Sequence, residues 1–239
     1  MTPDSPAAVI FDLDGTLVYS QGAYFAAERE ALAHFGHHQF TAADHAEFVG
    51  VGMREMWRRV VATRCVRAGA DELLELSNRL YLDHVRRAVT LHRGVVHLAG
   101  LLRVAGVPLA VASGSSRQVI DTVLTSSRLT SLFPVWVSAE EVPRGKPDPA
   151  VFLEAARRLS VPAGACVAVE DAAPGVSAAL RAGMRCVAVS GTAARPYPGA
   201  VRSGRLLVAE HEVFDPRDVM RRIGAMSTRM APPPPKARR

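Results

Sequence analysis

Short apolar runs alternate with helical patterns over the C-terminal two thirds of the chain, and this alternation restricts the fold more than any other feature. Runs that are apolar at almost every position are typical of strands covered on both faces. Alternation with helices favours parallel pairing. The expected strands are VPLAVAS, FPVWVS, ACVAVED, RCVAVS and RLLVAE, separated by helical segments such as SRQVIDTVLTSS, PAVFLEAARRLS and PGVSAALRAGM. The sequence therefore predicts an α/β fold with a Rossmann-like, doubly wound parallel sheet.

The strand pattern is missing between the first apolar run, residues 7–10, and about residue 93. This part of the chain reads as helices, in GAYFAAEREALAHFG, MREMWRRVVATRCV and ADELLELSNRLYLDHVRRAV. An insertion that leaves and returns beside a strand end is placed to cover that end. We expect a helical cap subdomain at residues 17–92, inserted into a core of residues 1–16 and 93–216.

The net charge of +6 arises at the C-terminal end. Residues 217–239 hold seven of the 29 Lys and Arg residues but one of the 23 Asp and Glu residues, so the rest of the chain is neutral. The final APPPPKARR is typical of a disordered tail, and no aromatic side chain is interleaved there to stack on bases. We expect a basic, Pro-rich segment apart from the core, and no nucleic-acid partner.

No apolar run approaches the roughly 20 residues that span a bilayer, and the N-terminus lacks the basic start of a secretory signal. Cys65, Cys166 and Cys186 lie far apart, without a Cys-x-x-Cys motif. These features predict a cytoplasmic protein without a membrane partner, whose thiols are buried and reduced. The oligomeric state is not readable from the sequence.

The first apolar run ends in two carboxylates, in the segment FDLDGT. Asp12 and Asp14 share one face of an extended strand, just before Gly15. Carboxylates so placed share a proton or need a cation, and hard oxygen ligands suit magnesium or calcium. A polar turn with a capping aspartate explains this segment equally well.

Polar side chains also follow later strands, at the ends where open parallel sheets collect ligands. Ser113 and Gly114 follow LAVA, Lys146 lies in GKPDP, and Glu170 and Asp171 end VAVED. Taken singly, these are a turn serine, an exposed lysine and a helix cap. Together they predict a magnesium site that faces a phosphate, where a carboxylate attacks phosphorus while lysine, serine and backbone amides hold the other oxygens.

Four segments, DLDGT, VASGS, GKPDP and VEDAAPG, resemble in order the four signature motifs of the haloacid dehalogenase-like hydrolase superfamily. From about residue 9 to residue 189 the chain is similar to the branch with a helical cap after the first motif, which includes sugar-phosphate phosphatases and beta-phosphoglucomutase. The resemblance implies that Asp12 is the nucleophile, which forms an aspartyl-phosphate and binds Mg²⁺. It implies that Asp14 is the general acid and base, with its backbone carbonyl on the metal. Thr16 and Val18 then lie near the cap hinge.

The same resemblance gives roles to the later motifs. Ser113, Gly114 and Lys146 would hold the phosphoryl group, and Lys146 would also steady the nucleophile. Asp171, with Glu170, would complete the magnesium shell. No zinc site is expected, because the eight histidines show no metal-binding spacing.

The chain departs from the family pattern at one place. Many relatives read DGTLVDS, whereas Tyr19 replaces the last aspartate here, which predicts altered cap packing. The segment VGVGMREMW matches in position a cap loop that faces the active site in relatives. Arg54 is therefore a candidate substrate contact, although a solvent-facing arginine on a helix fits equally well.

The resemblance implies a magnesium-dependent phosphatase that acts on a small phosphorylated metabolite, such as a sugar or polyol phosphate. The alternative is a phosphomutase of the beta-phosphoglucomutase type, which would need a bisphosphate primer and return an isomer. A non-catalytic binding protein of the same fold is disfavoured, because all the charged motif residues are present. A dehalogenase is disfavoured because it does not keep the second aspartate of the first motif.

Overall fold

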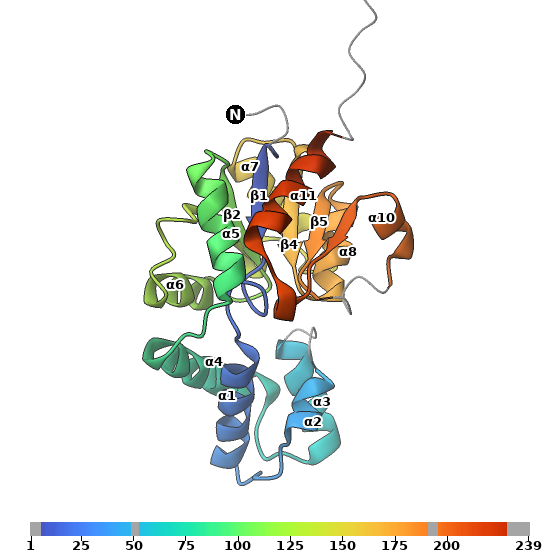
Figure 1. Ribbon diagram of the computed structural model, residues 1–239. Helices are drawn as coiled ribbons and strands as arrows, with labels where there is room; N and C mark the ends of the chain where they lie inside the picture. The colour runs from blue at the N-terminus through green and yellow to red at the C-terminus, as the bar shows by residue number, and fades with distance from the viewer. Residues whose placement is uncertain (1–5, 49–52, 191–195, 229–239) are drawn as a thin grey trace, which may run out of the picture.

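A parallel sheet forms the centre of the protein, whose computed structural model describes residues 6–48, 53–190 and 196–228. Within these residues, six strands pair in the order β3-β2-β1-β4-β5-β6 (Figure 1). The strands are β1 (Ala8–Phe11), β2 (Leu109–Ser113), β3 (Val135–Ser138), β4 (Cys166–Glu170), β5 (Arg185–Ala188) and β6 (Leu206–Val208). The predicted α/β fold with a doubly wound parallel sheet is confirmed.

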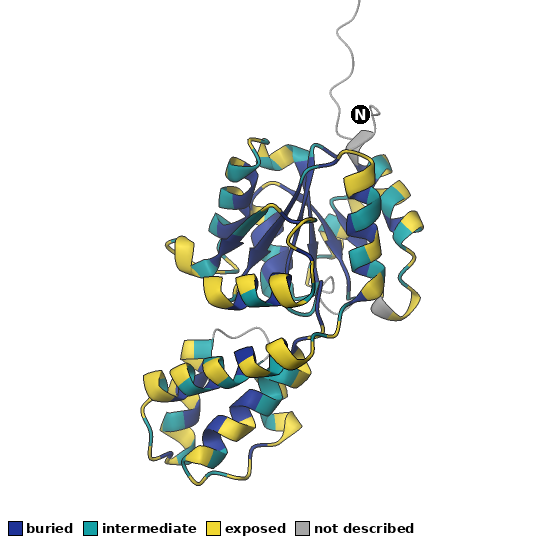
Figure 2. Cartoon of the chain, turned by 90° about the vertical axis from the view of Figure 1, so that its left-hand side faces the viewer, coloured by how far each residue is buried: buried dark blue, intermediate teal, exposed yellow. Residues whose placement is uncertain are grey.

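Helices cover both faces of the sheet (Figure 1). One face carries α5 (Arg93–Val104), α6 (Arg117–Ser126) and α11 (Pro216–Thr228), and the other carries α7 (Ala150–Arg158) and α8 (Ala173–Arg181). The shorter elements are α10 (Pro198–Arg202) and the 3₁₀ turns η1 (Ala139–Glu141), η2 (Ala163–Ala165) and η3 (His211–Val213). Figure 2 shows the buried strands between helices whose outer sides are exposed.

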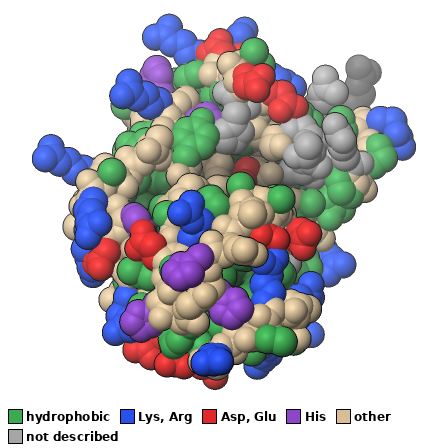
Figure 3. All heavy atoms as spheres, turned by 90° about the horizontal axis from the view of Figure 1, so that it is seen from below, with side chains coloured by type: hydrophobic (Ala, Val, Ile, Leu, Met, Phe, Trp, Pro, Cys, Tyr) green, Lys and Arg blue, Asp and Glu red, His purple; other side chains and the backbone are tan. Residues whose placement is uncertain are grey.

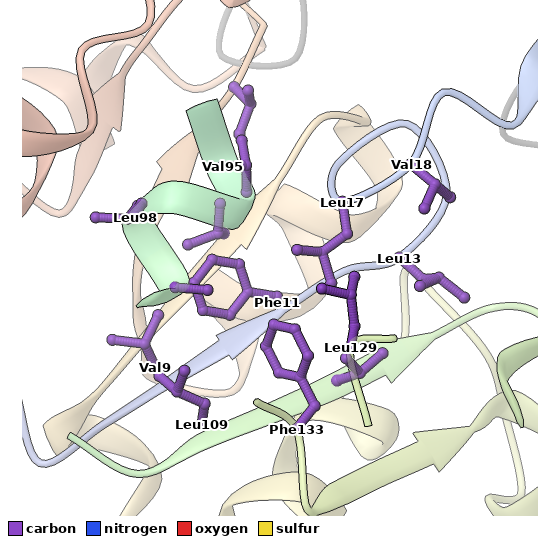
Figure 4. Close-up of a cluster of buried hydrophobic side chains, with 14 of the residues drawn as sticks. Val9, Phe11, Leu13, Leu17, Val18, Val95, Leu98, Leu109, Leu129 and Phe133 are labelled. Carbon is purple, nitrogen blue, oxygen red and sulfur yellow. The ribbon is translucent and has the colours of Figure 1, made fainter. Parts of the chain in front are cut away.

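The inner strand β1 shows why its run is apolar throughout. Val9 and Phe11 belong to the apolar cluster on the α5 side, where the Phe11 and Phe133 rings meet edge to face with centroids 5.5 Å apart (Figure 4). Ala8 and Ile10 belong to the cluster on the α7 side. Every β1 residue is buried. A strand covered on both faces can place polar side chains only where it ends.

Helices between β1 and α5 form a cap at the carboxyl ends of the strands (Figure 1). They are α1 (Gln21–His34), α2 (Ala42–Ala46), α3 (Met53–Arg64) and α4 (Ala70–Arg87). The cap has its own apolar core around Trp57, whose Nε1 donates to Ser77 Oγ at 3.0 Å. A helical insert is thus present, as the fold prediction requires, while its proposed bounds at residues 17–92 stay a prediction.

The chain enters and leaves the cap through two paired segments. Val18 forms an antiparallel bridge with Leu91, and the backbone N–H of His92 donates to the Leu17 carbonyl at 2.9 Å. Tyr19 stacks on the His92 ring, with centroids 5.3 Å apart. The tyrosine that replaces the family's aspartate therefore packs at the crossing between cap and core.

The last helix differs from the expectation. The charge of residues 217–239 predicts a segment apart from the core, whereas α11 lies against α5. Val219, Ile223 and Met226 are buried in the apolar cluster that contains Phe11. Their spacing of four and three places them on one helical face, which a count of charges does not detect. Residues 229–239, with the expected tail, lie outside the described residues.

Two smaller expectations have mixed outcomes. No helix in the described ranges is long and apolar enough to cross a membrane. Cys166 and Cys186 are buried, but the prediction of a buried thiol is wrong for Cys65, which is exposed just after α3 at a φ of 49°.

Replacing Ile223 by Ala tests whether α11 belongs to the core. Ile223 is fully buried, so its loss should reduce the free energy of unfolding by about 2–5 kcal/mol. The exposed neighbour Arg221→Ala, a matched control on the same helix, should change it by less than about 0.5 kcal/mol. Urea unfolding measures both. Equal stabilities of the two variants would contradict the packing of α11.

Candidate active site

The chain turns sharply after β1 and directs two carboxylates toward the cap. Asp12 still pairs with β4, because its backbone N–H donates to the Val169 carbonyl at 2.9 Å. Gly15 then takes a φ of 85°, and a Cβ added there would lie 2.1 Å from Asp171 Oδ2. Glycine is required at this position by both its conformation and the close approach. The DLDGT segment is therefore held against the end of β4.

One ammonium group joins the ends of β1 and β4. Lys146 Nζ donates to Asp12 Oδ1 at 2.5 Å and to Glu170 Oε1 at 2.7 Å. The three side chains are 11%, 7% and 2% exposed, in that order. Hydrogen bonds between ionised groups are strong when they are shielded from water in this way. The structure thus brings together three residues from three separate predicted motifs.

Three carboxylates form a candidate cation site. Asp12, Glu170 and Asp171 each offer an oxygen atom, and these atoms lie within 4.8 Å of one another. Thr16 Oγ1 donates to Asp171 Oδ1 at 2.9 Å, and the backbone N–H of Ala172 donates to Glu170 Oε2 at 2.9 Å. These bonds fix the orientation of the carboxylates. Hard oxygen ligands in this arrangement fit a divalent cation.

Burial and mutual repulsion shift the pKa values of these groups. Burial raises the pKa of Asp12 well above its usual value, and the charges of Glu170 and Asp171 raise it further against the opposing effect of Lys146. Burial, followed by the charge of Glu170, raises the pKa of Asp171 to about 7. Burial alone would lower the pKa of Lys146, but the two neighbouring carboxylates raise it above its usual value. The carboxylates therefore keep the lysine charged, and a cation near Asp12 and Asp171 would favour their ionised forms.

Asp14 is held by a chain of hydroxyl groups from both core and cap. Ser115 Oγ donates to Asp14 Oδ2 at 2.6 Å, and the Tyr81 hydroxyl donates to Oδ1 at 3.2 Å. The Tyr24 hydroxyl lies 2.9 Å from Ser115 Oγ. Because the single Ser115 hydrogen points to Asp14, Tyr24 is the donor in that contact. The two tyrosine rings stack with centroids 3.9 Å apart.

Burial, with the charge of Asp14, raises the pKa of both tyrosines above the usual value, so both remain donors at neutral pH. Ser115, Tyr24 and Tyr81 are parts of the site that we did not predict from the sequence. The polar run after LAVA could have indicated Ser115 from the sequence. The two tyrosines lie on helices, and no local pattern shows which element their side chains face.

The predicted phosphate-binding turn lies beside this network. Gly114 and Ser115 line the cavity described below, whereas Ser113 is fully buried and is not among the lining residues. Ser113 Oγ accepts the Ser115 N–H at 3.0 Å and lies 3.5 Å from Asp14 Oδ2. The turn therefore presents Gly114 and the second serine to the cavity.

Arg54 does not join the site in this structure. Its guanidinium forms an ion pair with Asp71 between exposed side chains of α3 and α4, and it is not among the residues that line the cavity. The preceding loop residues 49–52 lie outside the described residues. Its role as a substrate contact stays a prediction.

A cavity of about 350 Å³ lies between the sheet edge and the cap. The core wall is formed by Asp12, Asp14, Gly114, Ser115, Ala139, Gly145, Lys146, Glu170, Asp171, Ala172, Pro174 and Gly175. The cap wall combines polar Gln21, Glu28 and His45 with Tyr24, Phe48, Met53 and Met56. A cavity of this size, where polar and charged groups converge beside apolar side chains, is typical of a site for a small molecule.

Outside the cavity, the surface at the cap end shows no segregation of charge. Basic and acidic side chains are interspersed over its described part (Figure 3). The cavity, where the charged motif residues converge, is therefore the candidate active site.

The chain is similar in sequence to several curated phosphatases. The chain is 32% identical to hexitol phosphatase B of Escherichia coli (strain K12) over 87% of its own length and 92% of that protein. It is 31% identical to a phosphoglycolate phosphatase of Pseudomonas fluorescens over 77% of its length and 70% of that protein. It spans only 18% and 48% of two longer Arabidopsis thaliana relatives, protein Suppressor of quenching 1, chloroplastic, and bifunctional riboflavin kinase/FMN phosphatase.

Among solved structures, CbbY from Rhodobacter sphaeroides in complex with phosphate aligns with a TM-score of 0.71 and 25% identity, covering 77% of this chain and 86% of that one. The family model described as haloacid dehalogenase-like hydrolase matches residues 9–189, which include all four motifs and the cap. The chain therefore belongs to the haloacid dehalogenase-like hydrolase family.

Proposed function

We propose that the protein is a Mg²⁺-dependent phosphatase that hydrolyses a small sugar or polyol phosphate through an aspartyl-phosphate intermediate. The observation that carries this proposal is the buried group of Asp12, Lys146, Glu170 and Asp171 at one end of a small cavity. The phosphatase names of the relatives and the phosphate in the CbbY structure support a phosphate ester as the substrate.

Asp12 is the proposed nucleophile. Its carboxylate attacks phosphorus in line, the new bond from carboxylate oxygen to phosphorus forms, and the bond to the leaving oxygen breaks. Lys146 already donates to Asp12 Oδ1, which orients the carboxylate. Lys146 together with the turn at Ser113 and Gly114 would hold the non-reacting phosphoryl oxygens.

Asp14 is the proposed proton donor and acceptor. It protonates the leaving oxygen in the first step and takes a proton from water in the second, when water attacks phosphorus and releases phosphate from Asp12. The hydrogen bonds from Ser115 and Tyr81 hold both Asp14 oxygens in place. Tyr81 lies on the cap, so the orientation of Asp14 depends on cap position.

The donor set fits a divalent cation. Asp12, Glu170 and Asp171, with the backbone carbonyl of Asp14, are the groups proposed to hold Mg²⁺. Bound Mg²⁺ would supply positive charge that neutralises the carboxylates and the phosphoryl oxygens. The raised pKa values of Asp12 and Asp171 support this need for a cation.

Replacing Asp12 by Asn tests the nucleophile. Phosphate release from a panel of sugar, polyol, glycolate and nucleotide monophosphates should fall by more than about 10³-fold, because the amide cannot form the intermediate. EDTA should abolish release by the wild type, and added Mg²⁺ should restore it. Asp121→Asn, at an exposed position on α6, is the matched control and should keep wild-type turnover.

Undiminished release by Asp12→Asn, or in EDTA, would contradict the proposal. Conversion of a hexose 1-phosphate to its isomer with a bisphosphate primer, without free phosphate, would favour the phosphomutase instead.

Replacing Tyr81 by Phe tests the support of Asp14 from the cap. Losing one hydrogen bond to Asp14 should lower kcat about tenfold, with a smaller change in KM. Tyr197 is not among the residues that line the cavity, and its hydroxyl donates to the Ala173 carbonyl, so the kcat of Tyr197→Phe should match the wild type. Steady-state kinetics with one substrate measures both variants. An unchanged kcat for Tyr81→Phe would show that this contact does not orient Asp14.

A further inference from the structure

The cap wall of the cavity contains a buried carboxylate that the proposed chemistry does not use. Glu28 lies on α1, is 1% exposed, and lines the same cavity as Asp12 and Lys146. Burying an ionised carboxylate is costly unless it is paired. A buried acid that faces the reacting groups across a small cavity is placed to contact the part of the substrate that leaves.

Glu28 is paired and oriented by His45. Its Oε2 lies 2.6 Å from His45 Nδ1, and His45 Nε2 lies 2.9 Å from Gln21 Oε1. Nδ1 faces a carboxylate and Nε2 faces an amide oxygen, and both of these partners accept hydrogen bonds. Both ring nitrogens are therefore engaged. Within the described residues no group donates to Glu28 Oε1, which leaves this oxygen available as an acceptor for a ligand.

The charged groups that line the cavity favour some leaving groups over others. Lys146 is the one Lys or Arg among the described residues that line the cavity, and it is already paired with Asp12 and Glu170. A carboxylate or a second phosphate on the leaving group would face Glu28 Oε1 as acceptor against acceptor, and no unpaired Lys or Arg among the described lining residues would balance its charge.

A neutral leaving group with hydroxyls can make favourable contacts with the same wall. A hydroxyl can donate to Glu28 Oε1, while carbon atoms pack against the apolar side chains of Tyr24, Phe48 and Met56 on the same wall. Polar contacts of this kind discriminate strongly, because a substrate without the donor leaves a buried acceptor unpaired.

We propose that Glu28, held by His45, determines substrate specificity by accepting a hydrogen bond from a hydroxyl of the leaving group. The protein then prefers polyol or sugar monophosphates over phosphoglycolate and over sugar bisphosphates. This inference rests on the proposed phosphatase function, and it names the leaving group of that reaction.

The test compares kcat/KM for sorbitol 6-phosphate and for 2-phosphoglycolate. The wild type should prefer sorbitol 6-phosphate by at least tenfold. Glu28→Gln should lose about tenfold on sorbitol 6-phosphate, mainly through KM, and gain on 2-phosphoglycolate because two acceptors no longer need to face each other. His45→Gln should shift the ratio in the same direction by a smaller factor, and this second variant guards against misfolding of the first.

Glu30→Gln is the matched control, because Glu30 lies on the same helix but pairs with His84 at 3.0 Å on the exposed side. It should keep the wild-type ratio. A ratio within twofold of the wild type in Glu28→Gln, or a wild type that prefers 2-phosphoglycolate or a sugar bisphosphate, would overturn the inference.

A binding measurement tests the role of Glu28 independently of turnover. Calorimetry with sorbitol 6-phosphate and Mg²⁺ should show about tenfold weaker binding to the Asp12→Asn, Glu28→Gln double variant than to Asp12→Asn alone. Loss of all turnover with this binding difference intact would contradict only the proposed function. Equal binding to the two variants would overturn the role of Glu28.

Discussion

The site depends on the concentration of negative charge at one buried sheet edge. Asp12, Asp14, Glu170 and Asp171 meet there, and Lys146 is the one ammonium group within hydrogen-bonding distance of any of them in the described structure. Carboxylates in low dielectric surroundings repel one another strongly. In the proposed reaction, a divalent cation would relieve that repulsion and attract a phosphoryl group, so one electrostatic constraint would account for both.

The order of the strands creates this concentration. β1 lies between β2 and β4, with Phe11 opposite both Val111 and Val169. The residues that follow these strands therefore emerge side by side, although Asp12 and Glu170 are far apart in sequence. Helices on both sheet faces exclude polar groups from the strands, so the strand ends are where charged side chains can gather.

Much of this arrangement can be predicted from the sequence, because its signals are local. Fully apolar runs indicate covered strands, and each motif directly follows or adjoins one. The structure adds what periodicity does not determine. The apolar positions around Ile223 form a buried face of α11, but a count of charges over this basic segment does not reveal it. Likewise, helical spacing predicts that Tyr81 and Glu28 lie on helices, but not that one reaches Asp14 and the other lines the cavity.

The cap therefore contributes to both halves of the proposed reaction. α1 carries Tyr24, which contacts the hydroxyl network at Asp14, and also Glu28, one helical turn further along. Positions four residues apart share a helix face, so a shift of α1 moves both side chains together. In the proposed reaction, recognition of the leaving group and support of Asp14 would therefore both depend on the position of α1.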